Sequence, residues 1–222
     1  MRGPGIPKGV VSNITNSHTD AAPTILQMLG VPLKDNFDGA PIAYTQDSIS
    51  KSNKSEMVNV EFWSGHGAPN LLTKAKYFNN TYKALRLQSD DHSLYYSTWC
   101  TGEHEFYDMN SDFIQMNNWL SDTPKPKGSP LQYYGRPQSE LIHRLDALLM
   151  VTKTCKQDSC RLPWSVLFPR GEVDSLQEAM KQEYDLFFLN QPKITFSACH
   201  AGNILEYEGE LNVNAFGGHA AV

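Results

Sequence analysis

The sequence has little of what marks a membrane protein or a nucleic-acid-binding protein. No apolar run in the 222 residues approaches the roughly 20 that a membrane-spanning helix needs. Asp and Glu, 24 in all, outnumber the 19 Lys and Arg, and no basic cluster stands out. The first residues also lack the charged and then apolar pattern of a signal peptide. We therefore expect neither a nucleic-acid partner nor a membrane partner.

Motifs of several enzyme classes are missing as well. The sequence contains no phosphate-binding Gly-rich loop, no H-E-x-x-H and no G-x-S-x-G. Ser17, His18, Thr19 and Asp20 lie together, but consecutive side chains point in diverging directions, so we interpret them as helix-capping residues. The histidines show no metal-ligand spacing. The residues alone therefore identify no catalytic set.

Three Asn-x-Ser/Thr sequons are present, and they point to a secretory compartment. They begin at Asn13, Asn53 and Asn79, and each could accept a glycan only in that compartment. A modest number of cysteines, held in disulfides, is consistent with a secreted chain.

The four cysteines fall into one close pair and two single residues. The four residues between Cys155 and Cys160 suit a small disulfide-closed loop after a helix. A zinc half-site is the alternative, although no second pair of Cys or His at matching spacing supplies the remaining ligands. Cys100 and Cys199 are left to pair with each other or with cysteines outside this chain.

Hydrophobic periodicity predicts helices joined to an antiparallel meander. In the first helix we expect Ile25, Leu26 and Leu29 to be buried, and in the first strand Val58, Val60 and Phe62 should face a core. The second helix carries Leu141, Leu145, Leu148 and Leu149 at helical spacing. The expected helices cover residues 17–32, 137–155 and 174–190, and the expected strands cover residues 57–63, 81–88, 93–99, 103–109 and 193–199.

One loop could present side chains to a ligand. His66 follows the first strand between two glycines, and Trp63 beside it could offer an apolar wall to an aromatic or sugar ring. A histidine in a loop is more often an ordinary surface residue. We retain Trp63 and His66 as candidate substrate contacts.

Several stretches in the same order resemble the sulfatase family. "RGPGIPKG", "SHTDAAPTILQMLGVP" and "FDGAPI" resemble the sulfatase segment that follows the catalytic half. "VEFW", "YKALRL" and "YYSTWCTGEHEFYDMNSD" are similar to the C-terminal subdomain of arylsulfatases, and "CKQDSCRLPWSVLFP" and "FSACHAG" are similar to the tail of secreted fungal arylsulfatases. Phe113 stands where the family usually has proline.

The resemblance implies an alkaline-phosphatase-like α/β fold, of which this chain would hold only the C-terminal portion, a few helices and a small antiparallel sheet. It divides the chain into residues 1–46, the tail end of the catalytic domain, and residues 47–222, the C-terminal subdomain. The family uses a formylglycine nucleophile from a C/S-x-P-x-R motif and a calcium ion held by Asp and Asn residues. This sequence contains neither motif, so we expect no calcium bound by this chain alone.

The resemblance therefore implies a C-terminal fragment of a sulfuric ester hydrolase that is inactive by itself and takes a small sulfated substrate only with its N-terminal half. Met1 would stand within the last strand before the Gly-Pro-Gly turn, so a signal peptide would lie in the missing part. The alternatives are a non-catalytic secreted binding or structural module and, more weakly, a histidine-dependent metal protein.

Overall fold

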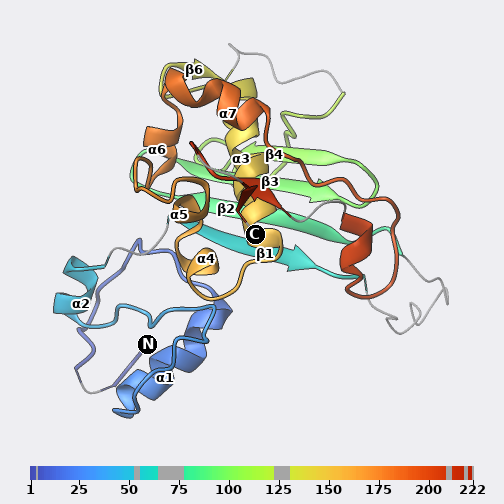
Figure 1. The fold of residues 1–222 in the computed structure, drawn as a ribbon. Coiled ribbons are helices and arrows are strands. Elements are labelled where there is room, and N and C mark those ends of the chain that lie inside the picture. Colours follow the sequence, from blue (N-terminus) through green and yellow to red (C-terminus); the bar gives the residue numbers. More distant parts are fainter. Residues whose placement is uncertain are drawn as a thin grey trace.

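A four-stranded antiparallel sheet forms the centre of the fold (Figure 1). Neighbouring strands follow one another in sequence, in the order β1-β2-β3-β4, as the expected meander requires. The strands are β1 (Met57–Phe62), β2 (Tyr82–Gln88), β3 (Ser93–Trp99) and β4 (His104–Asp108). The computed structural model describes residues 1–3, 5–52, 56–64, 78–122, 131–208, 212–217 and 220–221.

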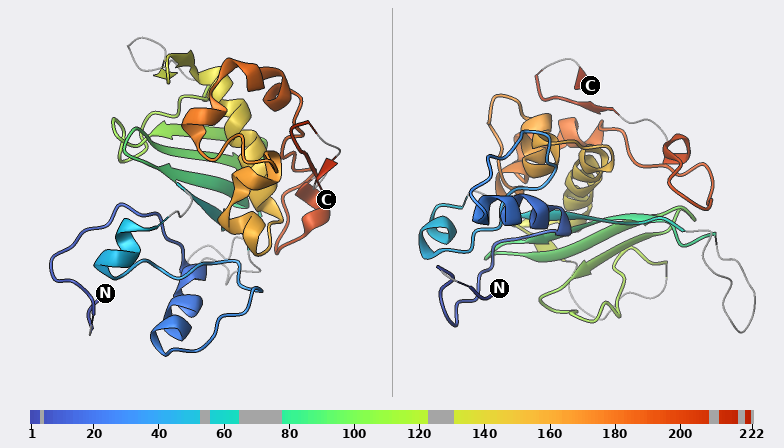
Figure 2. Two further views of the ribbon diagram at one scale, coloured as in Figure 1. Left: turned by 60° about the vertical axis from the view of Figure 1, so that its left-hand side comes forward. Right: turned by 90° about the horizontal axis from the view of Figure 1, so that it is seen from below.

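Helices cover one face of this sheet, as both views in Figure 2 show. The long helix α3 (Gln138–Lys153) begins directly after Pro137 and lies across the sheet. Its expected apolar stripe is buried, with Leu141, Leu145, Leu148 and Leu149 no more than 1% exposed. These side chains pack with the inward residues of β2 to β4 in one hydrophobic core, which places a two-layer α/β unit at the centre of the chain.

Shorter elements complete the chain. The N-terminal part holds the 3₁₀ helix η1 (His18–Asp20), α1 (Ala21–Met28) and α2 (Gln46–Ser50). A small hairpin of β5 (Gln132–Tyr133) and β6 (Arg136–Pro137) precedes α3. After α3 come α4 (Asp158–Arg161), α5 (Pro163–Leu167), α6 (Leu176–Ala179), η2 (Gln182–Tyr184), α7 (Asp185–Leu189), η3 (Leu205–Glu208) and the hairpin of β7 (Val213–Asn214) and β8 (Ala220–Ala221).

The predicted core face of β1 is wrong. Val58 and Val60 are only partly buried, and Phe62 is 47% exposed. Met57, on the alternate face, belongs to the core instead. β1 is an edge strand, and its side chains at positions 58, 60 and 62 lie on the face of the sheet that α3 does not cover. The alternation of apolar residues shows that two faces exist, but it does not identify which of them α3 covers.

The expected helix over residues 174–190 is broken into α6, η2 and α7. Two arginines bind the backbone carbonyls where the helix would continue: Arg144 Nε donates to Ala179 O at 3.1 Å, and Arg136 Nη1 donates to Met180 O at 2.8 Å. Arg144 is fully buried and also pairs with Asp185 at 2.5 Å. Burial alone would raise the pKa of Asp185, but hydrogen bonds from both arginines outweigh it and lower that pKa.

The first helix is shorter and more exposed than the sequence predicts. Ser17 caps η1, and the Asp20 side chain closes the capping box by accepting from the Ser17 N–H. Ile25 is 56% exposed and Leu29 is 71% exposed, so the predicted burial is wrong for these two residues, whereas Leu26 is partly buried. The buried residues of α1 are Pro23 and Thr24.

Residues 193–199 do not form the strand that the sequence predicts. Ser197 N donates to Tyr207 O at 2.8 Å, which ties this segment to η3 rather than to a strand of the sheet. Ile194 still reaches the core. The segment therefore has an irregular conformation.

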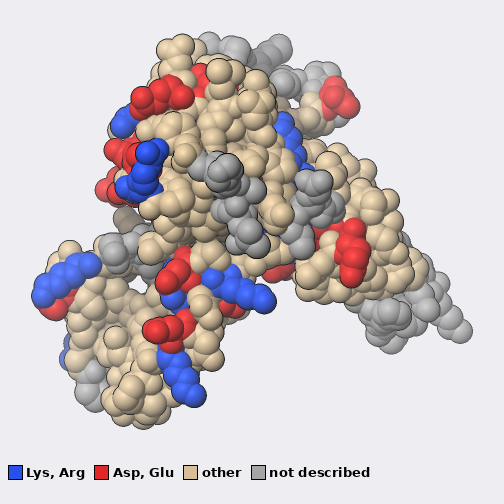
Figure 3. Space-filling view, in the orientation of Figure 1, with Lys and Arg blue, Asp and Glu red and all other residues tan. Residues whose placement is uncertain are grey.

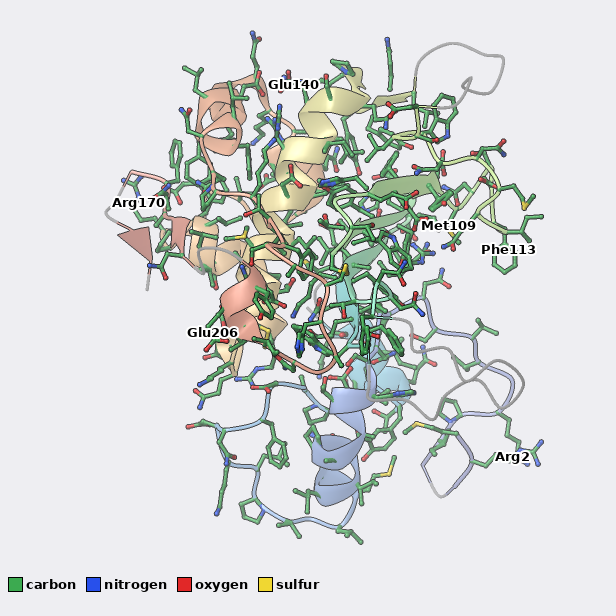
Figure 4. All side chains as sticks on the ribbon, turned by 90° about the vertical axis from the view of Figure 1, so that its right-hand side faces the viewer. Arg2, Met109, Phe113, Glu140, Arg170 and Glu206 are labelled. Atoms are coloured by element: carbon green, nitrogen blue, oxygen red, sulfur yellow. A yellow bond between two sulfur atoms is a disulfide. The ribbon has the colours of Figure 1, made fainter. Side chains whose placement is uncertain are left out.

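The loop after β4 has a defined turn although it lacks the proline of the family pattern. The Asp112 carboxylate is buried and accepts from Met116 N at 3.0 Å and Asn117 N at 2.8 Å. These bonds present Phe113, which is 79% exposed, to the solvent. Figure 4 shows Met109 and Phe113 on the side of the sheet away from the helices.

Candidate functional site

A cavity of about 670 Å³ lies between the N-terminal part and the edge of the sheet. Its walls are residues 15–20, strand β1 from Met57 to Glu61, the end of α3 and the loop that begins with Cys155. Figure 3 shows acidic and basic side chains gathered where the N-terminal part meets α4. This cavity is a candidate site for a ligand.

A buried charge cluster lies at one end of this cavity. Lys83 is 1% exposed, and its ammonium pairs with Glu61 and, at 3.2 Å, with the carboxylate of Glu208. Lys153 Nζ donates to the backbone oxygen of Glu208 at 2.6 Å. Two cations and two carboxylates thus compensate one another; Lys83, Lys153 and Glu208 are buried, whereas Glu61 lies at the exposed side of the cluster.

Burial shifts the proton affinities in this cluster. Desolvation lowers the pKa of Lys153 to about 8, with Glu208 opposing the shift and Lys83 adding to it. Desolvation also raises the pKa of Glu208, against the effect of Lys83. Because each of these charged groups is already engaged with another group, the cluster is better suited to holding β1, β2, α3 and η3 together than to proton transfer.

Trp63 lies beside this cluster. The Lys83 ammonium is 4.5 Å from the centre of a Trp63 ring, and Trp63 Nε1 donates to Glu61 Oε2 at 3.1 Å. Trp63 is not among the residues that line the 670 Å³ cavity. Its role as a substrate contact stays a prediction, and His66 lies outside the described residues.

The cysteines form two disulfides, Cys155–Cys160 and Cys100–Cys199. The first is the small loop after a helix that the spacing predicts, and these sulfurs are therefore not zinc ligands. The second joins the end of β3 to the segment before η3 across 99 residues of chain. Spacing could not choose this pairing, which depends on the fold.

The glycosylation sequons are accessible where they are described. Asn13 and Asn79 are both exposed. Asn53 lies outside the described residues. Glycan attachment at the three positions stays a prediction.

A second polar group was not recognised in the sequence. His92 is 2% exposed, and its Nδ1 lies 2.8 Å from the Tyr134 hydroxyl and 3.0 Å from Ser89 Oγ. Its Nε2 lies 3.5 Å from a Glu56 carboxylate oxygen. Burial lowers the pKa of His92 to about 4, so the ring is neutral at pH 7. His92 and Tyr134 are 42 positions apart in the sequence, and no local sequence pattern predicts that they are in contact.

The carboxylates of Asp20 and Asp38 beside the cavity are engaged with backbone N–H groups. Asp20 accepts backbone N–H bonds from Ser17 and, at 2.8 Å, from Ala40, while Asp38 accepts from Gln157 N at 2.7 Å. Calcium needs six to eight oxygen ligands that converge on one point. Among the described residues, no group of three or more His, Cys, Asp or Glu is placed to hold a metal ion.

Within the same described part of the chain, none of the helices combines the length and the apolar character that crossing a membrane requires.

No protein-family model matches this chain. Individual proteins do match it along most of its length. The sulfatase ppz1 of Metarhizium majus is 39% identical over 217 residues, which cover 97% of this chain and 43% of that protein. Arylsulfatases of Volvox carteri and Chlamydomonas reinhardtii are each 30% identical, over 97% and 90% of this chain and over 33% and 31% of their own lengths.

The chain belongs to the sulfatase family, of which it represents a C-terminal part. It spans less than half the length of each of these relatives. Its helices and four-stranded antiparallel sheet are accordingly a fragment of the alkaline-phosphatase-like fold that these relatives imply.

Proposed function

We propose that this chain is the C-terminal portion of an arylsulfatase-like sulfuric ester hydrolase and that it does not hydrolyse aryl sulfates by itself. Its share of the enzyme is to complete the catalytic part and to shape the substrate entrance, to which Trp63 and His66 contribute. The nucleophile and the calcium ligands belong to the other part of the enzyme, which also forms most of the pocket for a small sulfated substrate.

The exposed apolar side of α1 carries this proposal. Ile25 in α1, Leu29 at its C-cap and Val31 just after it are 56%, 71% and 44% exposed. Contiguous apolar surface of this kind marks an interaction surface in a soluble protein. More than half of the length of these relatives lies outside the matched region. In the whole enzyme, that other part would cover the apolar side of α1.

A direct assay tests the expected inactivity. The purified chain is incubated with 4-nitrophenyl sulfate and calcium, beside an active arylsulfatase as a positive control. We expect no release of 4-nitrophenol above the buffer rate. Calcium-dependent turnover by the chain alone would contradict the proposal.

A chimaera tests the role of α1. The matching region of the Metarhizium majus sulfatase is replaced by this chain, and hydrolysis is compared with and without Ile25→Asp and Leu29→Asp. We expect these two changes to abolish activity in the chimaera, whereas Gln27→Asp, at an exposed polar position of the same helix, leaves it unchanged. If all three substitutions had the same effect on activity, the apolar side of α1 would not be the interface with the catalytic part.

Passage through the secretory pathway is the second part of the proposal. Two disulfides and the exposed sequon residues Asn13 and Asn79 support it. Mass spectrometry of secreted material, before and after enzymatic removal of N-glycans, is expected to show bridged Cys155 and Cys160 and a loss of glycan mass. Free thiols at both positions in that material would refute it.

A secreted binding or structural module derived from a sulfatase is the second candidate, favoured by the lack of a catalytic set among the described residues. The genomic sequence upstream of the Met1 codon discriminates between the two. An open reading frame that encodes C/S-x-P-x-R supports the enzyme, and an authentic start at Met1 supports the module.

A further inference from the structure

Residues 17–42 are joined internally by hydrogen bonds. Asp20 Oδ1 accepts from Ala40 N at 2.8 Å, and Thr24 Oγ1 accepts from Ile42 N at 2.8 Å. Gly39 lies against η1 so closely that a Cβ there would be 2.3 Å from Thr19 O. The segment that carries the apolar side of α1 therefore holds together as one piece, here called the α1 unit.

The α1 unit is attached to the Cys155–Cys160 loop. Gln157 N donates to Asp38 Oδ1 at 2.7 Å, and Arg161 Nη1 donates to the backbone oxygen of Phe37. Figures 1 and 2 show the N-terminal part beside α4, which belongs to this loop. The disulfide loop is thus a point at which the α1 unit is bonded to the rest of the molecule.

The conformation of Gln157 explains why the disulfide matters for this attachment. Gln157 has φ of 56° and ψ of −123°, a backbone conformation that favours glycine. The covalent bond closes the loop across five positions, and Gln157 lies inside this loop with its N–H directed at Asp38. Without the bond, we expect Gln157 to relax to a negative φ and to turn its N–H away.

The same disulfide is open to small molecules. Both cysteines are only partly buried, and both line the 670 Å³ cavity. The cavity carries charges of both signs, from Lys153 and Arg161 and from Asp20, Asp38 and Glu61, so access rather than net charge distinguishes this disulfide. Cys100 of the other disulfide is buried, so a reductant has less access to it.

We infer that the Cys155–Cys160 disulfide is a thiol-exchange site that acts as a redox-sensitive latch on the α1 unit. A dithiol reductant attacks one sulfur as a thiolate, the S–S bond breaks, and a mixed disulfide forms. The second thiol of the reductant then displaces the protein sulfur. The reductant loses two electrons and becomes a cyclic disulfide, while Cys155 and Cys160 each end as a thiol with one proton. The α1 unit is then free to change its orientation to the sheet.

Amide exchange followed by NMR during titration with dithiothreitol tests the latch in the full chain. Differential alkylation with mass spectrometry identifies which disulfide is reduced. We expect Cys155–Cys160 to be reduced before Cys100–Cys199, and the Gln157 amide to exchange roughly tenfold faster or more, as the loss of a charge-assisted bond implies. The Ala40 amide and the amides of β2 and β3 keep their protection.

Two results would overturn the inference. In the first, Cys155–Cys160 is reduced and the Gln157 amide keeps its protection. In the second, the Ala40 amide loses protection to the same extent, which indicates unfolding of the α1 unit rather than its release.

A pair of variants keeps the test independent of the cysteines. Asp38→Ala removes the acceptor of the Gln157 bond and leaves the disulfide intact, so it is expected to accelerate Gln157 exchange in the oxidised chain. Asp35→Ala changes an exposed carboxylate of the same loop and is expected to have no effect. Equal exchange in the two variants would show that Asp38 does not hold the latch.

Discussion

The two disulfides are expected to contribute unequally to the stability of the chain, and the difference follows from the lengths of the loops they close. Cys100–Cys199 joins residues 99 positions apart, and Cys155–Cys160 joins residues five positions apart. In the chain-entropy model, a cross-link restricts the unfolded chain more strongly when it closes a longer loop. The cost of losing it is then about 5 kcal/mol for the long loop and about 2 kcal/mol for the short one.

The double variants Cys100→Ala/Cys199→Ala and Cys155→Ala/Cys160→Ala test this expectation. Alanine keeps each site apolar and leaves no unpaired hydroxyl where Cys100 is buried. The free energy of unfolding is measured by guanidinium denaturation at pH 7 with the remaining disulfide intact. We expect the first variant to lose about 3 kcal/mol more than the second.

Equal losses in the two variants would refute this reasoning. That result would mean that the contribution of each bond comes from local packing in the folded state rather than from restriction of the unfolded chain. The slope of the free energy against denaturant is compared as well, because a compact unfolded state changes it.

Three further predictions concern buried groups and one close backbone approach. Lys83→Met leaves the buried Glu208 carboxylate without its partner and is expected to lower the free energy of unfolding by about 3 to 5 kcal/mol at pH 7. This loss should become smaller toward pH 5, because the raised pKa of Glu208 favours protonation of the carboxylate in the folded state. Between pH 6.5 and pH 4.5 the unfolded His92 binds a proton and the folded one, with a pKa of about 4, does not, so this residue lowers the free energy of unfolding by about 2 kcal/mol over that range. The variant His92→Gln is expected to lack this decrease. An unchanged dependence of the free energy of unfolding on pH would contradict the prediction. Gly39→Ala places a Cβ 2.3 Å from a backbone oxygen and should destabilise the N-terminal part by about 1 to 3 kcal/mol in thermal unfolding, whereas a neutral effect would show that the backbone yields there.

The local pattern of the sequence determined the elements that have strong periodicity and clear ends. The stripe of leucines at positions 141, 145, 148 and 149 predicted α3 and its buried face correctly. Aromatic and β-branched alternation predicted the meander of β2, β3 and β4. The spacing of Cys155 and Cys160 indicated the small disulfide loop. In each case the interactions that decide the structure lie within a few residues or between consecutive strands.

Tertiary contacts decided the rest. The interruption near Met180 depends on Arg136 and Arg144, more than 30 residues away, whose guanidinium groups bind carbonyls that a continuous helix would use. The exposure of Ile25 and Leu29 depends on which surfaces lie opposite α1, and the helical pattern carries no record of them.

The sequence by itself indicated the sulfatase family, because several motifs of that family occur in the same order along the chain. Only the tertiary structure decided that Asp38 meets the Cys155–Cys160 loop and that Lys83 meets Glu208, since these contacts join residues more than 100 positions apart. Such contacts depend on how the layers pack, and periodicity in a short window cannot encode them.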